Sequence, residues 1–204
     1  MKYLKGKHQQ GKQKLLAFGN PRTDKPLRHS VEELATISRL FKGSEIYTED
    51  LASEARFKDL APEYDLIHLA CHSELNSSYP MLSGLLLAPG SGEDGKLNAY
   101  ELFAMHLNAD LVVLSGCETG LGQMTNGDEL VGLARAFIYA GASANVSSLW
   151  KVDDESTCYL MKRFYEYLTD HSEAESLRLA QLDSLKKYKE QRLIQFSSEE
   201  LKHI

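Results

Sequence analysis

Two residue types that together perform nucleophilic and acid–base chemistry follow two apolar runs. His72 comes directly after "DLIHLAC" (residues 65–71), and Cys117 comes directly after "LVVLSG" (111–116). A free thiol is only a few per cent thiolate at neutral pH, and a neighbouring imidazole is the simplest means to keep it reactive and later to protonate a leaving amine. The pair is therefore a candidate nucleophile and general base.

The residues beside this pair suit acyl transfer. Gly116 and Gly120 permit a tight turn with exposed backbone N–H groups around Cys117. The N–H groups of Cys117 and Ser73 are candidates for an oxyanion hole, because donors of this kind stabilise the charge that develops on an attacked carbonyl oxygen. The sequence thus offers a nucleophile, a base and oxyanion donors.

The elements that must position these residues alternate between two periods. Short apolar runs rich in branched or aromatic residues predict strands within 14–18, 44–47, 64–71, 109–117 and 143–150. Helical patterns at 30–41, 129–142 and 154–168 lie between them, the first with Ser30 as its expected cap and Glu33 at the third helical position. This alternation predicts an α/β fold with a mostly parallel sheet that helices cover on both faces.

Two further segments extend this pattern. Residues 84–103 hold an apolar run, a glycine-rich turn and a short helical pattern, which predicts a hairpin insertion beside the main sheet. Residues 172–191 predict a final amphipathic helix packed on the sheet, with a partner-binding helix as the alternative.

The predicted sheet brings the candidate pair together. In open parallel sheets, ligands bind outside the carboxyl ends of the strands, and His72 and Cys117 each lie just past such an end. Successive βα units usually lie side by side, so we expect the two strand ends to be neighbours about 5 Å apart.

Composition excludes several other classes of protein. The chain has 204 residues, 43% of them apolar, a net charge of −6 and three cysteines. We expect a single main domain with reduced thiols in the cytoplasm, because no apolar run approaches the ~18 residues of a membrane span and the first residues lack a signal-peptide pattern. The acidic balance argues against a nucleic-acid surface, although lysines give residues 1–13 a basic character that predicts a flexible tail.

Other chemistry-bearing residues favour structural roles. Cys71 alternates to the opposite strand face from His72, and Cys158 lies in a helical pattern, so both are expected to pack. His68 is expected to be a core histidine hydrogen-bonded to backbone. A metal site shared with Cys71 and His72 is disfavoured, because four extended residues separate His68 from His72 by about 13 Å.

The stretch "GSGEDGKL" (90–97) has the spacing of a phosphate-binding loop. It lacks the hydroxyl residue that binds magnesium, since Leu97 stands there, and Glu93 and Asp94 would repel phosphate. A turn is the better interpretation, and neither a metal nor another cofactor is expected.

Several motifs in order resemble the CHAT domain, a bacterial branch of the caspase-like cysteine peptidases related to separase: "DLIHLACHS", "GLLLAP", "LSGCETG", "GDELVGLARAFIYAGA" and "SLWKVDD". The resemblance implies a caspase-like three-layer α/β/α sandwich and cleavage of proteins by a dyad of His72 and Cys117. These two are 45 residues apart, close to the ~50 of caspases. Family members often carry TPR repeats, so a TPR-containing or other regulatory protein is an expected partner.

The resemblance leaves substrate specificity open. Relatives that cut after Arg or Lys often carry an aspartate two residues before the cysteine, where this chain has Ser115. Asp128, Asp153 and Asp154 follow strands at the expected edge and are candidate substrate-binding acids, with helix capping as the alternative. Trp150 is a candidate for the substrate groove or for the core.

The chain departs from the family pattern at two places. Ser73 stands where the family usually has glycine, and residues 191–204 offer only a weak apolar segment where the family usually has a last strand. We therefore expect a domain over 14–190 and a C-terminal tail over 191–204, with an incomplete last strand as the alternative for that tail. Two functions remain open: a cysteine endopeptidase regulated by a partner or an attached sensor domain, and an inactive caspase-like module that binds proteins.

Overall fold

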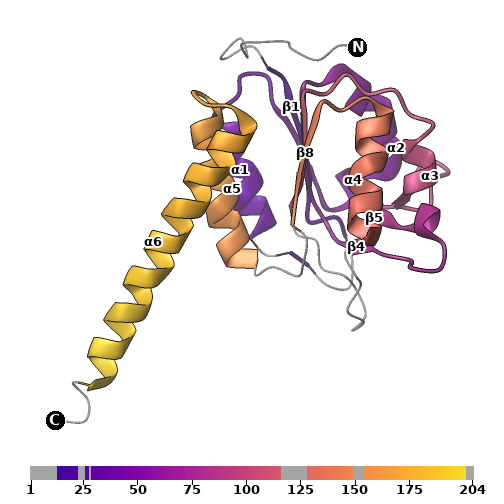
Figure 1. Ribbon diagram of the computed structural model, residues 1–204. Coiled ribbons are helices and arrows are strands. Elements are labelled where there is room, and N and C mark those ends of the chain that lie inside the picture. Colours follow the sequence, from indigo (N-terminus) through magenta and orange to yellow (C-terminus); the bar gives the residue numbers. More distant parts are fainter. Residues whose placement is uncertain (1–12, 23–25, 28, 116–127, 149–153, 201–204) are drawn as a thin grey trace.

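A five-stranded parallel sheet forms the centre of the protein (Figure 1). The computed structural model describes residues 13–22, 26–27, 29–115, 128–148 and 154–200. The strands lie in the spatial order β2-β1-β3-β7-β8, and each neighbouring pair is parallel. Their bounds are Leu15–Gly19 (β1), Glu45–Thr48 (β2), Leu66–Ala70 (β3), Leu111–Ser115 (β7) and Ala144–Ser147 (β8). All five match strands predicted from the apolar runs.

Helices cover both faces of this sheet, as Figure 1 shows. On one face lie α1 (Ser30–Ser38), α5 (Asp154–Leu168) and α6 (Glu173–Glu200). On the other lie α2 (Glu54–Leu60), α3 (Ala99–Leu102) and α4 (Asp128–Ala140). The three-layer α/β/α sandwich expected from the alternation of strands and helices is therefore confirmed.

A small antiparallel sheet interrupts the alternation between β3 and β7. It consists of β4 (Ser73–Glu74), β5 (Gly84–Leu86) and β6 (Lys96–Asn98), in that spatial order. The predicted hairpin insertion is thus confirmed, and β4 adds a third strand directly after His72. The single-turn helix η3 (Pro80–Leu82) lies in the connection from β4 to β5.

Alternate residues of each central strand enter two separate cores. On β3, Ile67 and Leu69 pack into the core beneath α2 and α4, whereas Leu66 and Ala70 pack into the core beneath α1, α5 and α6. Because both faces are buried, the strand is a continuous apolar run rather than an alternating one. Cys71 continues the alternation into the core beneath α4 and is buried, so its predicted packing role is confirmed.

One polar network lies inside the core beneath α1 and α5. His68 of β3 places Nε2 2.8 Å from Oε1 of Glu33 and Nδ1 3.1 Å from the hydroxyl of Tyr165. All three side chains are buried. Burial raises the pKa of the Tyr165 hydroxyl well above its usual value, and the charge of Glu33 raises it further. The prediction of a backbone partner for His68 was wrong, since its ring contacts side chains from two helices.

The start of α1 also differs from the prediction. The N-cap residue is His29, which makes no side-chain capping bond, and the Ser30 hydroxyl instead donates to the carbonyl oxygen of Leu27 at 2.8 Å. Glu33 therefore does not complete a capping box, because its carboxylate faces His68. The helix ends at Ser38 rather than at residue 41.

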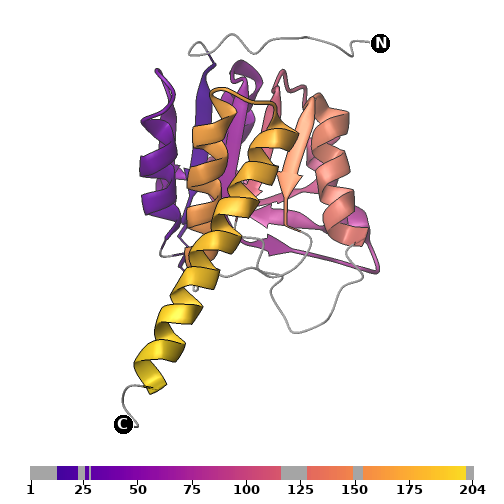
Figure 2. The same ribbon diagram turned by 60° about the vertical axis from the view of Figure 1, so that its left-hand side comes forward.

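The last helix, α6, runs from Glu173 to Glu200, so residues 191–200 are helical and do not form a last strand. Its first half packs on α5, where Arg163 and the hydroxyl of Tyr167 both bind Asp183 Oδ2, at 2.7 and 2.8 Å. Its second half extends beyond the three layers, past the edge at which α5 begins (Figures 1 and 2). Within the described ranges, no helix is both long enough and apolar enough to cross a membrane.

The buried contact between Glu33 and His68 gives a stability prediction. We expect Glu33→Ala to lower the free energy of unfolding by about 3 kcal/mol, because it leaves Nε2 of the buried His68 imidazole without its acidic partner. Glu32→Ala, at the exposed neighbouring position of the same helix, should change it by less than about 0.5 kcal/mol. Urea unfolding measures both values, and equal effects of the two substitutions would show that the network contributes nothing.

Candidate active site

The ends of β3 and β7 lie side by side at one edge of the central sheet. Ala70, the last residue of β3, pairs with Ser115, the last residue of β7, and the preceding residues of the two strands keep the same register. The prediction that these two strands are neighbours is confirmed. His72 follows β3 after Cys71 and is buried, with 7% of its surface exposed.

The register of the small sheet fixes the direction of the Ser73 backbone. The Leu86 N–H donates to the carbonyl oxygen of His72 at 2.8 Å, so these two residues form a hydrogen-bonded antiparallel pair. The next pair, Ser73 with Leu85, is then a non-hydrogen-bonded pair, in which the N–H groups point away from the partner strand. Since β4 is an edge strand of its sheet, the Ser73 N–H faces the side of β4 away from β5.

The Ser73 side chain lies on a different side from its N–H. Ser73 and Leu85 are directly opposite each other, so their side chains share one face of the small sheet. Leu85 belongs to the buried core beneath α4, and Ser73 is only 1% exposed. The Ser73 hydroxyl has no hydrogen-bond partner among the residues that the structure describes. The serine that replaces the expected glycine therefore adds a buried hydroxyl without blocking the N–H direction.

Three of the five other candidate site residues lie outside the residues that the structure describes, namely Cys117, Trp150 and Asp153. Asp128 and Asp154 are the first residues of α4 and α5. These two helices follow β7 and β8, which are neighbours in the sheet.

A cluster of charged residues that the sequence did not reveal braces the insertion. The ammonium nitrogen of Lys58, on α2, lies 2.7 Å from Glu54, 2.8 Å from Glu93 and 2.8 Å from Glu101. Burial lowers the pKa of Lys58, but the bonds to these carboxylates more than compensate and raise it overall. The cluster joins α2, the turn between β5 and β6, and α3, and so holds the hairpin that pairs with β4.

Burial and hydrogen bonds have opposite effects on the carboxylates of this cluster. Burial raises the pKa of Glu54, although Lys58 and the Gly95 N–H, which donates to it at 2.8 Å, oppose the rise. Burial also acts to raise the pKa of Glu101, but hydrogen bonds from Lys58 and Asn98 lower it overall.

The same three carboxylates have oxygen atoms within 4.8 Å of one another, close enough to hold a metal ion. The Lys58 ammonium lies within hydrogen-bond distance of each carboxylate and supplies the positive charge that a metal ion would bring. Of this cluster, the sequence signals only the four-residue spacing of Glu54 and Lys58 on one helix.

The phosphate-loop spacing at 90–97 belongs to a hairpin turn. It joins β5 to β6, whereas a phosphate-binding loop joins a strand to the N-terminus of a helix. The backbone N–H of Gly90 bonds the carbonyl of Glu93, and Glu93 returns the bond. Gly95 has a φ of +90°, and a Cβ there would lie 2.8 Å from the Leu87 carbonyl oxygen, so this turn requires glycine.

Cys158, the other cysteine that the sequence predicts to pack, is half-buried in α5.

The protein has the fold class of a three-layer α/β/α sandwich. His72 lies just past β3, one of the central strands of its sheet. The family model described as "CHAT domain" matches residues 2–200, which is nearly the whole chain. The protein therefore belongs to the CHAT domain family, as the motifs indicated.

Other comparisons cover less or carry less weight. A segment of 72 residues is 38% identical to the mouse protein "Tetratricopeptide repeat protein 28", which amounts to 35% of this chain and 3% of that protein. The chain thus spans a small fraction of that relative's length. A Streptococcus pneumonia TIGR4 flavodoxin covers 76% of this chain and 96% of its own, at 15% identity and a TM-score of 0.43. A short-chain flavodoxin associated with a bacterial microcompartment covers 76% and 94%, at 14% and 0.39. Neither TM-score is high enough to support a conclusion about this protein.

Two buried serines, Ser73 in β4 and Ser83 directly before β5, give a paired stability prediction. Ser83→Ala should lower the free energy of unfolding by about 1 kcal/mol, because the Ser83 hydroxyl accepts a bond from the Asn76 N–H at 2.9 Å. Ser73→Ala should leave it unchanged or raise it, because the Ser73 hydroxyl is buried without a described partner. Denaturant unfolding of both variants tests this. A loss at Ser73 as large as that at Ser83 would reveal a bond from the hydroxyl of Ser73.

The lysine at the centre of the acidic cluster gives a second prediction. Lys58→Met should destabilise the fold by about 3 kcal/mol, because it leaves the buried carboxylate of Glu54 without its counter-charge. Lys96→Met is the matched control, since Lys96 pairs with the largely exposed Glu74 and its loss should cost less than about 1 kcal/mol. Thermal unfolding ranks the two, and the reverse order would refute the bracing role of Lys58.

Proposed function

We propose that this protein is a caspase-like cysteine endopeptidase in which His72 and Cys117 form the catalytic dyad. The observation that carries the proposal is the pairing of Ala70 with Ser115 at the ends of β3 and β7. His72 and Cys117 each follow these paired residues by two positions. Neighbouring parallel strands lie about 4.8 Å apart, so equal extension past a paired position favours contact between the two side chains.

The chemistry of this dyad proceeds in two steps. The imidazole of His72 takes the thiol proton, and the Cys117 sulfur attacks the carbonyl carbon of a peptide bond. The N–H groups of Ser73 and Cys117 hold the oxyanion, and the direction of the Ser73 N–H away from β5 supports its part in this. His72 then protonates the leaving amine, and a water molecule hydrolyses the thioester to release the second product and the free thiol.

The substrate side chain before the cut would contact residues that follow β7 and β8. Asp128, Asp153, Asp154 and Trp150 are the candidates, because α4 and α5 begin at the edge of the sheet to which His72 belongs. An aspartate in this pocket would select lysine or arginine at the position before the scissile bond, through its charge. Trp150 would pack against the substrate backbone or against the methylene groups of the substrate side chains.

Regulation by a second protein fits a peptidase of this type. An intracellular peptidase must stay inactive until it is required, and the binding of a second protein beside the candidate dyad would supply that control. A TPR-containing or other regulatory protein is the proposed partner, supported by the likeness of part of this chain to a protein named for such repeats. We place this activity in the cytoplasm, without direct contact with nucleic acid or membrane.

A second candidate function is an inactive module that binds proteins. Exposed aromatic and aliphatic side chains from η3, α3 and α4 favour it, namely Met81, Leu82, Tyr100, Ile138 and Tyr139. Tyr139 is 71% exposed and its ring lies 4.7 Å from that of Phe103, so α3 and α4 share this apolar surface. Surfaces of this kind mark contacts with other proteins.

The reactivity of the Cys117 thiol tests the proposed dyad. In the native chain we expect iodoacetamide to label Cys117 rapidly even below pH 7, because an adjacent imidazole stabilises the thiolate. In His72→Ala the rate should fall at least about tenfold, and its pH dependence should move to that of an ordinary thiol near 8.5. Peptide mapping by mass spectrometry assigns the label to one cysteine.

The matched control is His106→Ala, which removes an exposed histidine and should leave the rate unchanged. Buried Cys71 provides an internal reference for slow labelling. A Cys117 thiol that reacts slowly and titrates near 8.5 in both the native chain and His72→Ala would contradict the dyad and favour the protein-binding module.

A further inference from the structure

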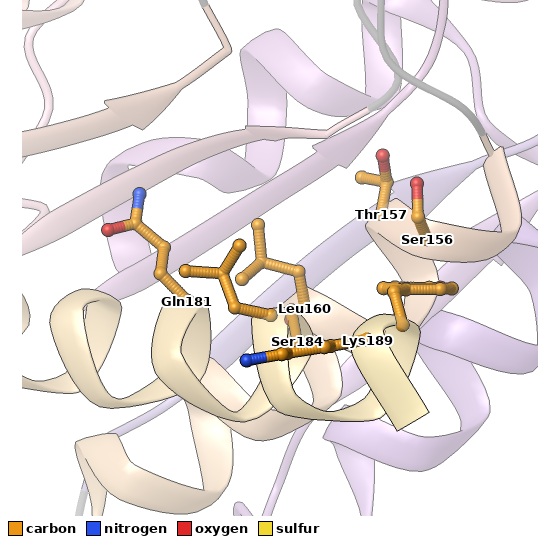
Figure 3. A pocket seen from close by; sticks show the side chains of 8 residues that line it. Ser156, Thr157, Leu160, Gln181, Ser184 and Lys189 are labelled. Atoms are coloured by element: carbon orange, nitrogen blue, oxygen red, sulfur yellow. The ribbon is translucent and has the colours of Figure 1, made fainter. Parts of the chain in front are cut away.

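A groove of about 710 Å³ lies between α5 and α6 (Figure 3), and His72 is not among its lining residues. Side chains from the first turns of α5 line one wall, and side chains from the middle of α6 line the other. Leu160 lies in its floor between these walls, as Figure 3 shows. The lining residues that carry the argument are Ser156, Thr157, Leu160, Leu185, Tyr188 and Lys189.

The groove combines apolar surface with a concentration of positive charge. Leu185 lines it and is 69% exposed, which is unusual for a leucine in a helix that packs on a core. Lys189 lines the groove and the neighbouring Lys186 is exposed. Of the acidic residues that flank this stretch, Asp183 is paired with Arg163, and Glu190 follows Lys189 in the sequence. The exposed carboxylate of Glu155 precedes the α5 wall and is the acidic group next to it in sequence.

Specific contacts fix the two walls relative to each other. Arg163 of α5 binds Asp183 of α6, which lies between the lining residues Gln181 and Ser184. The ammonium of Lys187 lies 3.9 Å from the centre of the Tyr159 ring, so this lysine ties α6 to α5. Lys189 makes no ion pair with any residue in the described part of the chain. The groove is thus preformed, and Lys189 remains available to a ligand.

We propose that this groove binds an acidic amphipathic helical segment of another protein. Leucine-sized side chains of that segment would pack against Leu160 and Leu185, and its carboxylates would meet Lys186 and Lys189. Charge complementarity favours an acidic partner, because Lys189 lines the groove and Lys186 is exposed next to Leu185. The concave shape between two helices favours a helix laid into a groove over a flat lipid surface.

The position of the groove gives such a partner access to the candidate site. Its α5 wall begins at Ser156, two residues after Asp154, the first residue of α5 and a candidate substrate-binding acid. The second half of α6 extends past this same edge of the sheet (Figures 1 and 2). Binding here goes beyond the proposed peptidase activity and does not depend on it, so the test below measures binding alone.

The test is a selection from a displayed library of helical peptides, each about 16 residues long with leucines on one face and all other positions randomised. A selection from this library against the whole chain should enrich peptides that are rich in Asp and Glu. Leu185→Glu and Lys189→Glu should each weaken their binding by at least about tenfold. Matched controls are Leu51→Glu and Lys42→Glu, which make the same substitutions at exposed positions away from α6 and should leave binding unchanged. Urea unfolding should show that all four variants remain folded.

Two results would overturn the proposal. The first is a selection that yields no acidic enrichment, or binders that are insensitive to Leu185→Glu and Lys189→Glu. The second is co-sedimentation of the chain with vesicles of phosphatidylserine and phosphatidylcholine that is lost in Leu185→Glu, without acidic peptide binders. That outcome would assign the basic, leucine-bearing face of α6 to an anionic membrane instead.

Discussion

The parallel pairing of β3 with β7 is the constraint on which the candidate site depends. Side chains alternate along a strand with a period of two, so a slip by one residue would move a whole set of side chains to the other face. The register that pairs Ala70 with Ser115 is held by apolar residues buried on both faces of the two strands. A slip would therefore move residues between two differently shaped cores, and Ala70 and Ser115 would no longer pair at the strand ends.

The insertion between β3 and β7 extends this constraint to the backbone around the histidine. The carbonyl of His72 is already bonded to β5, so the pairing of β4 with β5 begins at the histidine itself. That pairing aims the Ser73 N–H away from β5 and its hydroxyl toward the core. Lys58 and its three carboxylates fix the β5–β6 hairpin from the opposite end. A partly buried ionic cluster on α2, the β5–β6 turn and α3 thus supports the strands that pair beside His72.

Periodicity was enough to predict the strands, the main helices and the hairpin, because each depends on residues that are close together in the sequence. The network of Glu33, His68 and Tyr165 could not be predicted in this way, since its members come from three elements and meet only in the folded core. Glu33 also has the spacing of a capping residue, and burial overrode that local preference. At residues 191–200, by contrast, the local helical propensity prevailed over the weak apolar pattern of a strand. Residue types and their place after strands led to His72 and Cys117 as the candidate pair, whereas the role of the Lys58 cluster required contacts across the fold.

The measurement that tests the central claim most directly is disulfide formation in His72→Cys under mild oxidation, with the bonds mapped by mass spectrometry. If positions 72 and 117 lie beside each other, their Cα atoms fall within the roughly 4.4–6.8 Å that a disulfide requires, and the introduced thiol should link to Cys117 rapidly. Cys71 and Cys158, which the strand alternation and the helix α5 place elsewhere, should remain free thiols. A Cys117 that stays reduced, or that links to another cysteine, would contradict the arrangement of the dyad.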